Sequence, residues 1–166
     1  NTYYQLGAGV FGSNYPTTSP GAVSGITTAS SVKAGGYFTC ALLDDESVRC
    51  WGSNWRGALG DGVLNNNYAA LTPTGLDGTI SLTEIYVGYN HACALAFGGT
   101  AYCWGANDFG QLGRGTMTSE EVTPALVTGL PEPIGNLALG TYHTCAVGWS
   151  GKTYCWGGNS DRKSVV

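Results

Sequence analysis

One sequence motif occurs three times in this chain, and its spacing shows how the rest of the sequence is organised. The copies are TCALLDDESVRCWGSN at 39–54, ACALAFGGTAYCWGAN at 92–107 and TCAVGWSGKTYCWGGN at 144–159. Each copy places two cysteines ten positions apart and follows the second cysteine with Trp-Gly and then Asn. A motif that recurs at this spacing is typical of one structural unit that has been copied and stacked on itself.

The asparagine that closes each copy gives the period of the repeat. Asn54, Asn107 and Asn159 are separated by 53 and 52 residues, and a glycine-rich turn such as WRGALGDG follows the first two. We therefore expect three repeats within residues 1–160 and no separate domain. Their approximate bounds are 1–53, 54–106 and 107–158. Residues 161–166, DRKSVV, resemble no part of a repeat and match an in-frame translation of a common sequencing-adapter oligonucleotide, so we interpret them as a non-native tail.

The composition favours short strands divided by turns. The chain has 27 glycines, only 11% charged residues and no helical apolar stripe. We expect four strands per repeat, which in the last repeat are 124–128, 136–139, 143–148 and 153–156. The last two strands of a repeat form a hairpin that can be checked by pairing. If Cys40 faces Cys50, Leu42 must face Val48 on the same side of the sheet.

Four-stranded units at a period near 50 residues are most simply the blades of a β-propeller. The segments AGGYFTCAL, VGYNHACAL and LGTYHTCAV, each followed by CWGxN and a GQLGxG-like turn, make the chain similar to the regulator of chromosome condensation family. That superfamily also includes beta-lactamase inhibitor protein II. The resemblance implies an all-β fold with about three blades of a ring of about seven, and therefore an open fragment. A weaker likeness of WSGKTYCW to the Asp-box of sialidase-type propellers lacks the central Asp.

The cysteines bear on the compartment in which the protein works. Equal spacing and opposed positions predict three disulfides, Cys40–Cys50, Cys93–Cys103 and Cys145–Cys155. Disulfides persist in oxidising surroundings, so we expect a secreted or cell-surface protein. The alternative is a cytosolic propeller in which the thiols are small core residues.

Strand direction predicts a binding face. In a blade, the loop that enters the hairpin and the loop that leaves it emerge on the same side, and both loops carry aromatic residues here. Aromatic anchors on rigid scaffolds commonly carry protein interfaces, and the resemblance to beta-lactamase inhibitor protein II implies a face of this kind that grips a partner. The alternative is that these residues pack between blades, as we expect for Trp51, Trp104 and Trp156. The expected partner-binding residues are Tyr3, Tyr4, Tyr37, Phe38, Trp55, Tyr89, Asn90, Phe109 and Tyr142.

Several other functions are disfavoured by the sequence. A formal net charge of −4 argues against nucleic acid as a partner. His91 and His143 each lie two residues before a cysteine, but the matching residue of the first copy is Phe38, which cannot ligate zinc. We find no catalytic motif or cofactor motif, and we expect no membrane span.

These observations predict a non-enzymatic protein-binding scaffold with a protein partner of unknown identity, whose sides pack against neighbouring blades. Two alternatives remain open. One is a propeller enzyme that acts on glycans, with its catalytic residues in other blades. The second is a regulator that resembles a guanine-nucleotide exchange factor.

Overall fold

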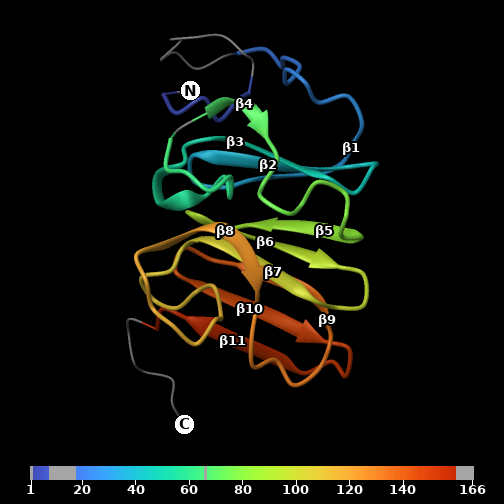
Figure 1. The fold of residues 1–166 in the computed structure, drawn as a ribbon, viewed down its shortest axis with the longest axis vertical. Coiled ribbons are helices and arrows are strands. Elements are labelled where there is room, and N and C mark those ends of the chain that lie inside the picture. The colour runs from blue at the N-terminus through green and yellow to red at the C-terminus, as the bar shows by residue number, and fades with distance from the viewer. Residues whose placement is uncertain (1, 8–17, 66, 160–166) are drawn as a thin grey trace.

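The computed structural model describes residues 2–7, 18–65 and 67–159, so the tail at 161–166 lies outside the described residues. The described chain contains eleven strands and one short 3-10 helix, η1 (Trp55–Gly57), which confirms the all-β prediction. The strands form three antiparallel sheets, which lie one beside the next and do not close into a ring (Figure 1).

We call the sheets sheet 1, sheet 2 and sheet 3. Sheet 1 has the order β1 (Ala29–Ala34), β2 (Phe38–Leu43), β3 (Val48–Gly52), β4 (Asn67–Leu71). Sheet 2 has the order β5 (Leu82–Val87), β6 (His91–Ala96), β7 (Ala101–Ala106), β8 (Glu120–Leu126). Sheet 3 contains β9 (Ile134–Leu139), β10 (His143–Gly148) and β11 (Thr153–Gly157), with β10 in the middle.

The hairpin register is the one that the sequence predicts. Cys40 pairs with Cys50, and Leu42 pairs with Val48. The corresponding cysteines pair in the same way across β6–β7 and across β10–β11. All three disulfides are formed, each with Cα atoms 4.1 Å apart, and the described residues include no free cysteine.

One strand belongs to a different sheet from the one that its place in the sequence suggests. The strand expected at 124–128 is β8, Glu120–Leu126, and it pairs with β7 of sheet 2. In the same way, β4 pairs with β3 of sheet 1. The glycine-rich turn after each Trp-Gly returns the chain to the sheet it has just left. A four-stranded sheet therefore takes its last strand from the sequence repeat that follows.

The tryptophan after the second cysteine connects neighbouring sheets, as expected. Trp104 of β7 is fully buried, and its Nε1 donates a hydrogen bond of 2.9 Å to the carbonyl oxygen of Ala58, in the β3–β4 loop of sheet 1. Trp156 donates in the same way to Gln111 O (2.9 Å), and Trp51 donates to Gln5 O (3.0 Å). Each indole therefore packs against the glycine-rich turn at the start of its own sequence repeat, and for Trp104 and Trp156 this turn lies in the preceding sheet.

Gly60 leaves the space that the Trp104 indole occupies. Its φ is +71°, and a Cβ atom there would lie 2.8 Å from Trp104 Nε1. We expect Gly60→Ala to lower the free energy of unfolding by about 2 kcal/mol, because it adds backbone strain and overpacks the indole. The matched control is Gly62→Ala, since Gly62 also has a positive φ (+88°) but its Cβ would meet no atom closer than 3.9 Å. Gly62→Ala should lower the free energy of unfolding by about 1 kcal/mol, as measured by urea denaturation. Equal decreases for the two variants would contradict the packing argument.

Candidate protein-binding face

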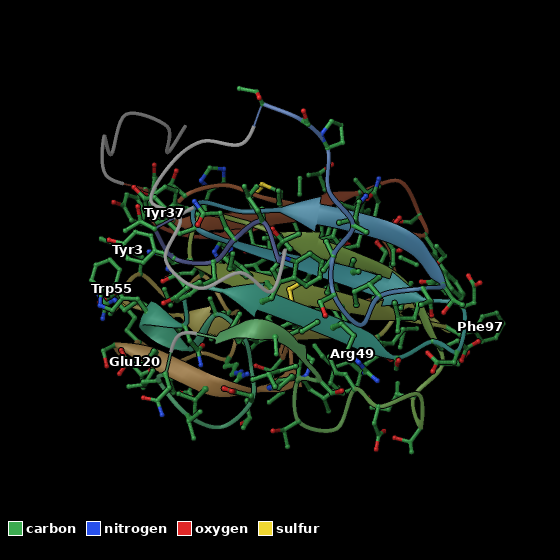
Figure 2. The ribbon with its side chains drawn as sticks, turned by 90° about the horizontal axis from the view of Figure 1, so that it is seen from above. Tyr3, Tyr37, Arg49, Trp55, Phe97 and Glu120 are labelled. Carbon is green, nitrogen blue, oxygen red and sulfur yellow. A yellow bond between two sulfur atoms is a disulfide. The ribbon has the colours of Figure 1, made fainter. Side chains whose placement is uncertain are left out.

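Five loops with exposed aromatic residues meet at one end of the sheets. Loops that enter β2, β6 and β10 carry Tyr37, Tyr89 and Tyr142, and loops that leave β3 and β7 carry Trp55 and Phe109. Figure 2 shows Tyr3, Tyr37 and Trp55 together at this end, with Phe97 at the opposite end. We call this surface the aromatic face. Its residues are Tyr3, Tyr37, Trp55, Tyr89, Phe109 and Tyr142.

The side chains of the aromatic face are exposed but held against one another. Trp55 is 64% exposed, and the other five residues are 38–52% exposed. The ring centroids of Tyr3 and Tyr37 are 5.0 Å apart, those of Tyr37 and Tyr89 are 5.8 Å apart, and those of Phe109 and Tyr142 are 4.9 Å apart. Rings held at these tilted and edge-on angles lose little conformational freedom when a partner binds.

A glycine in one sheet makes room for an aromatic ring of the next. A Cβ atom at Gly36 would lie 2.8 Å from the Tyr89 ring, and the Gly36 amide donates a hydrogen bond of 3.1 Å to Tyr89 O. Tyr89 therefore leans over the loop of sheet 1 and reaches Tyr37. This contact between sheets makes the aromatic face continuous across the sheet boundary.

Arg56 fixes the loop that carries Trp55. Its Nη2 donates to both carboxylate oxygens of Asp108 (2.7 and 2.9 Å) and its Nη1 donates to Glu120 (3.2 Å), which joins the β3–β4 loop of sheet 1 to sheet 2. The same guanidinium lies 5.5 Å from the centroid of the Trp55 ring. Arg56 and Asp108 lie in the loops that leave β3 and β7, and no sequence pattern indicates that they pair.

Three of the residues predicted for this face contribute little to its surface. Phe38 is only 1% exposed, and it belongs to the core between sheets 1 and 2, because β2 begins at this residue and directs the side chain inward. Its place in the predicted binding set is wrong. Asn90 is half-buried, and its carbonyl accepts a hydrogen bond of 2.9 Å from the Ala106 amide. Tyr4 is half-buried with a φ of +63°.

The aromatic face contains two adjoining hollows. The larger has a volume of about 680 Å³, and it is lined by Tyr3, Tyr37, Trp55 and Tyr89 together with Ser53 and Asn65. The second, of about 290 Å³, shares Trp55 and Tyr89 with the first and extends towards Phe109 and Tyr142. Trp55 and Tyr89 thus stand between two depressions that a partner's side chains could enter.

The tyrosine hydroxyls of this face influence one another. A hydrogen bond with Tyr37 raises the pKa of Tyr89, and burial and the neighbouring charges of Tyr37, Tyr142 and Tyr3 act in the same direction. Tyr89 is therefore a neutral phenol at physiological pH. Its hydroxyl can donate or accept a hydrogen bond with a partner.

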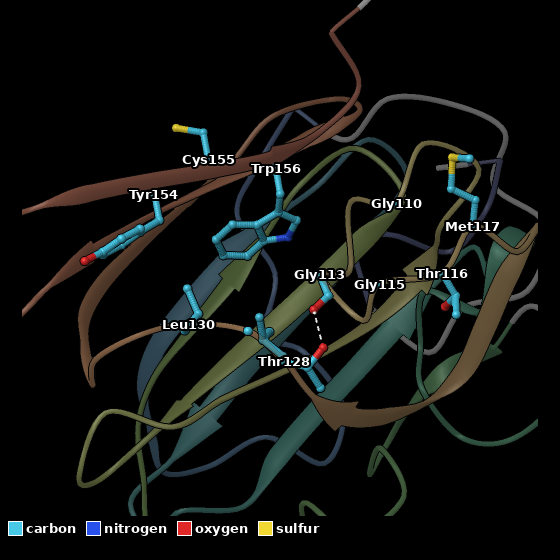
Figure 3. Close-up of a pocket in the computed structure, with 12 residues that line it drawn as sticks. Gly110, Gly113, Gly115, Thr116, Met117, Thr128, Leu130, Tyr154, Cys155 and Trp156 are labelled. Atoms are coloured by element: carbon cyan, nitrogen blue, oxygen red, sulfur yellow. Dashed lines mark hydrogen bonds between the residues drawn. The ribbon is translucent and has the colours of Figure 1, made fainter.

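A separate groove lies beside the edge strand β11. Figure 3 shows Trp156 and Tyr154 on one side, and Gly113 and Thr128 on the other, where Thr128 Oγ1 donates a hydrogen bond of 3.3 Å to Gly113 O. In sheet 2 the matching place is filled by β8. Its residues Glu121–Thr123 pack on Gly57 and Gly62, which are the counterparts of Gly110 and Gly115 in this groove. The groove thus has the position of a fourth strand for sheet 3.

The described residues contain neither a cluster of metal ligands nor a helix that could span a membrane. No group of three or more His, Cys, Asp or Glu side chains is placed so that it could hold a metal ion. None of the helical structure described is long and apolar enough to cross a membrane.

Comparison with known proteins identifies the repeat. A family model described as "Regulator of chromosome condensation (RCC1) repeat" matches residues 98–147, and a second model with the same description matches 29–57 and 82–111. Together the matches cover more than half of the chain. The chain belongs to the RCC1 repeat family. Sheets 1 to 3 are accordingly blades of an RCC1-type β-propeller.

Two curated relatives illustrate how far the likeness extends. The RCC1 domain-containing protein RUG3, mitochondrial, of Arabidopsis thaliana is 29% identical over 86% of this chain and 32% of its own length. The ultraviolet-B receptor UVR8 of the same plant is 32% identical over 78% of this chain and 30% of its own length. The chain therefore spans about a third of the length of these relatives.

Solved structures show the same fold. Human WBSCR16 superposes with a TM-score of 0.84 over 95% of this chain and 40% of its own, at 19% identity. Yeast RCC1 (Prp20), solved bound to Kap60, gives a TM-score of 0.69 over 80% of this chain and 33% of its own, at 22% identity. The ectodomain of the Physcomitrella patens receptor kinase CR4 gives a TM-score of 0.51 over 78% of this chain and 29% of its own, at 21% identity.

Proposed function

We propose that this chain is part of a secreted or cell-surface, non-enzymatic propeller that binds a protein partner through the aromatic face. The observation that carries the proposal is the set of six exposed aromatic side chains contributed by successive repeats to one end of the sheets. Such residues are the usual anchors of protein interfaces, and here disulfide-bonded hairpins and the Arg56 pairs hold them in place. Yeast RCC1 of the same fold was solved with a protein bound, which agrees with this kind of use.

The extracellular part of the proposal depends on the cysteines. All six cysteines are paired, and three disulfides are favoured where the surroundings are oxidising. The receptor ectodomain from Physcomitrella patens shows the fold in an extracellular protein, whereas RUG3 is a mitochondrial relative. Alkylation of the native protein followed by mass spectrometry tests this point. Six labelled thiols without reductant, in protein taken from its natural source, would refute an extracellular location.

Trp55→Ala tests the binding face directly. The partner is first isolated by cross-linking the wild-type chain to extracellular proteins. We expect Trp55→Ala to bind this partner at least tenfold more weakly, because truncation of a central aromatic anchor commonly costs about 2 kcal/mol of binding free energy. The matched control is Trp149→Ala. Trp149 is equally exposed, at 65%, but it lies in the β10–β11 turn at the other end of the sheets. Undiminished capture by Trp55→Ala, or an equal loss in both variants, would refute the proposed face.

A further inference from the structure

The larger hollow of the aromatic face has the properties of a cation-binding site. Tyr3, Tyr37, Trp55 and Tyr89 bound it, and the residues that line it among those described carry no charge. The faces of aromatic rings carry negative partial charge and attract ammonium and guanidinium groups, with Trp as the strongest acceptor. A hollow with four such rings and no basic residue of its own is suited to a cation from outside.

The charges around the hollow point in the same direction. Among the described residues, Arg56 follows Trp55 directly and is matched by two carboxylates, Asp108 and Glu120, so this group of side chains carries an excess of negative charge. The chain as a whole has a formal net charge of −4. Arg56 also shows that the Trp55 ring accepts a guanidinium at close range, because the two groups lie 5.5 Å apart.

We propose that the hollow bounded by Tyr3, Tyr37, Trp55 and Tyr89 receives an Arg or Lys side chain of the bound protein partner. This inference rests on the proposed function, because it names the group that the aromatic face recognises. The phenol groups add acceptors at the rim. The rings of Tyr37 and Tyr89 lie edge-on with centroids 5.8 Å apart, and their neutral hydroxyl oxygens can accept hydrogen bonds from a guanidinium or ammonium group. Arg is also among the residues that most often act as anchors in protein interfaces.

The test uses two small peptides that differ only in charge. Acetyl-Gly-Arg-Gly-amide and its citrulline counterpart have almost the same shape, but citrulline is neutral. Each peptide is titrated into the ¹⁵N-labelled chain, and the indole N–H signal of Trp55 is followed by NMR. We expect saturable shifts in about the millimolar range with the arginine peptide, and about tenfold weaker binding of the citrulline peptide.

Two variants test whether the arginine peptide binds in this hollow. Trp55→Ala should abolish the shifts of the tyrosine signals, whereas Trp149→Ala should leave the titration unchanged. Equal binding of the two peptides, no binding of the arginine peptide, or shifts centred on Trp149 would each overturn the inference. Preferential binding of an uncharged disaccharide would overturn it as well and would assign the hollow to carbohydrate.

The two hypotheses fail separately. Loss of the charge preference refutes the cation site and leaves the protein-binding face untouched, if Trp55→Ala still reduces capture of the partner. Undiminished capture by Trp55→Ala refutes the proposed function whatever the peptides show.

Discussion

Reduction of the three disulfides is expected to unfold this chain at room temperature. Each bridge closes a loop of 11 residues, which corresponds to about 2–3 kcal/mol of stability on the chain-entropy estimate. Three bridges therefore contribute roughly 8 kcal/mol, which is comparable with the total free energy of unfolding of a typical protein. Neighbouring sheets share a hydrophobic core, and the side chains of that core meet only when the hairpins are in register. Loss of the bridges therefore weakens the core as well as the hairpins.

The order of reduction is also predictable. The cysteines of the Cys40–Cys50 and Cys93–Cys103 bridges are fully buried, whereas Cys145 is half-buried and Cys155 is exposed. We expect Cys145–Cys155 to open first as phosphine reductant is added, with little loss of near-ultraviolet circular dichroism. The signal should be lost when the buried bridges open.

Paired replacements separate the contributions of the bridges. Cys93→Ala with Cys103→Ala should lower the free energy of unfolding by about 3 kcal/mol, because it removes both the cross-link and packing in the core between sheets 2 and 3. The matched control, Cys145→Ala with Cys155→Ala, removes a loop of the same length at a more exposed place and should cost about 2 kcal/mol. For the replacements, equal losses in the two double variants would contradict the role of burial. For reduction of the wild-type chain, a native near-ultraviolet spectrum with all six cysteines labelled would contradict the expected unfolding.

The hairpins could be predicted because antiparallel pairing is a matter of counting. Once Cys40 is opposite Cys50, every other pair in that hairpin is fixed, and the structure has those pairs. The position of Trp104 was predictable for a similar reason, because one residue type at one repeat position in every copy indicates the same packing role. The aromatic face followed from strand direction, since both ends of a hairpin lie at the same end of the sheet.

The remaining features depend on which sheet lies against which. Strand β8 follows the Trp-Gly of its own hairpin, and nothing in its sequence says that it returns to β7 rather than advancing to β9. Burial is equally a property of the neighbours. Phe38, His91 and His143 share one repeat position, yet the first two are buried and His143 is exposed. For the same reason the pairing of Arg56 with Asp108, 52 residues away, left no mark in the local sequence.

The burial of His91 leads to the second large prediction, a loss of stability in mild acid. His91 is fully buried between sheets 2 and 3, with Nε2 3.0 Å from Thr144 Oγ1. Thr144 gives its own proton to Gln111 O (2.9 Å), so its oxygen accepts from His91 Nε2–H and the imidazole is the neutral Nε2–H tautomer. His91 Nδ1 has no hydrogen-bond partner among the described residues. A proton added there would be buried without an acceptor.

The direction of the pH effect follows from the two pKa values. Burial, with a smaller contribution from the neighbouring His143, lowers the pKa of His91 from its ordinary value of 6.5 to about 4. The unfolded chain therefore binds a proton at a higher pH than the folded chain does. This contribution to stability is complete above pH 6.5, and it is lost progressively as the pH falls from 6.5 to about 4. The total loss is about 3 kcal/mol.

His91→Phe should remove this dependence. Phe38 occupies the same repeat position in sheet 1 and is buried there, so a benzyl side chain fits this environment in one copy of the unit. Urea unfolding at pH 7, 5.5 and 4.5 should show wild-type stability falling by about 1.4 kcal/mol per pH unit at the steepest point, and a nearly flat profile for the variant. The pKa values of the Asp45, Asp77 and Glu132 carboxyl groups are lowered, mainly by hydrogen bonds to Ser47, Thr79 and Ser150. The stability that these groups contribute is lost only as the pH falls through the ordinary carboxyl pKa values of 3.8 to 4.5 and below, so the change between pH 7 and 5.5 reports His91.

The matched control is the exposed histidine at the same position of sheet 3. His143→Phe removes an exposed imidazole and leaves His91 buried, so the wild-type pH profile should persist with only a small change from the lost coulombic effect on His91. A flat profile for the wild-type protein between pH 7 and 4.5 would refute the buried neutral imidazole. A profile for His91→Phe that parallels wild type would assign the acid sensitivity to other groups. The total loss of stability between pH 6.5 and 4 in the wild-type protein thus measures how strongly sheets 2 and 3 exclude water from the imidazole between them.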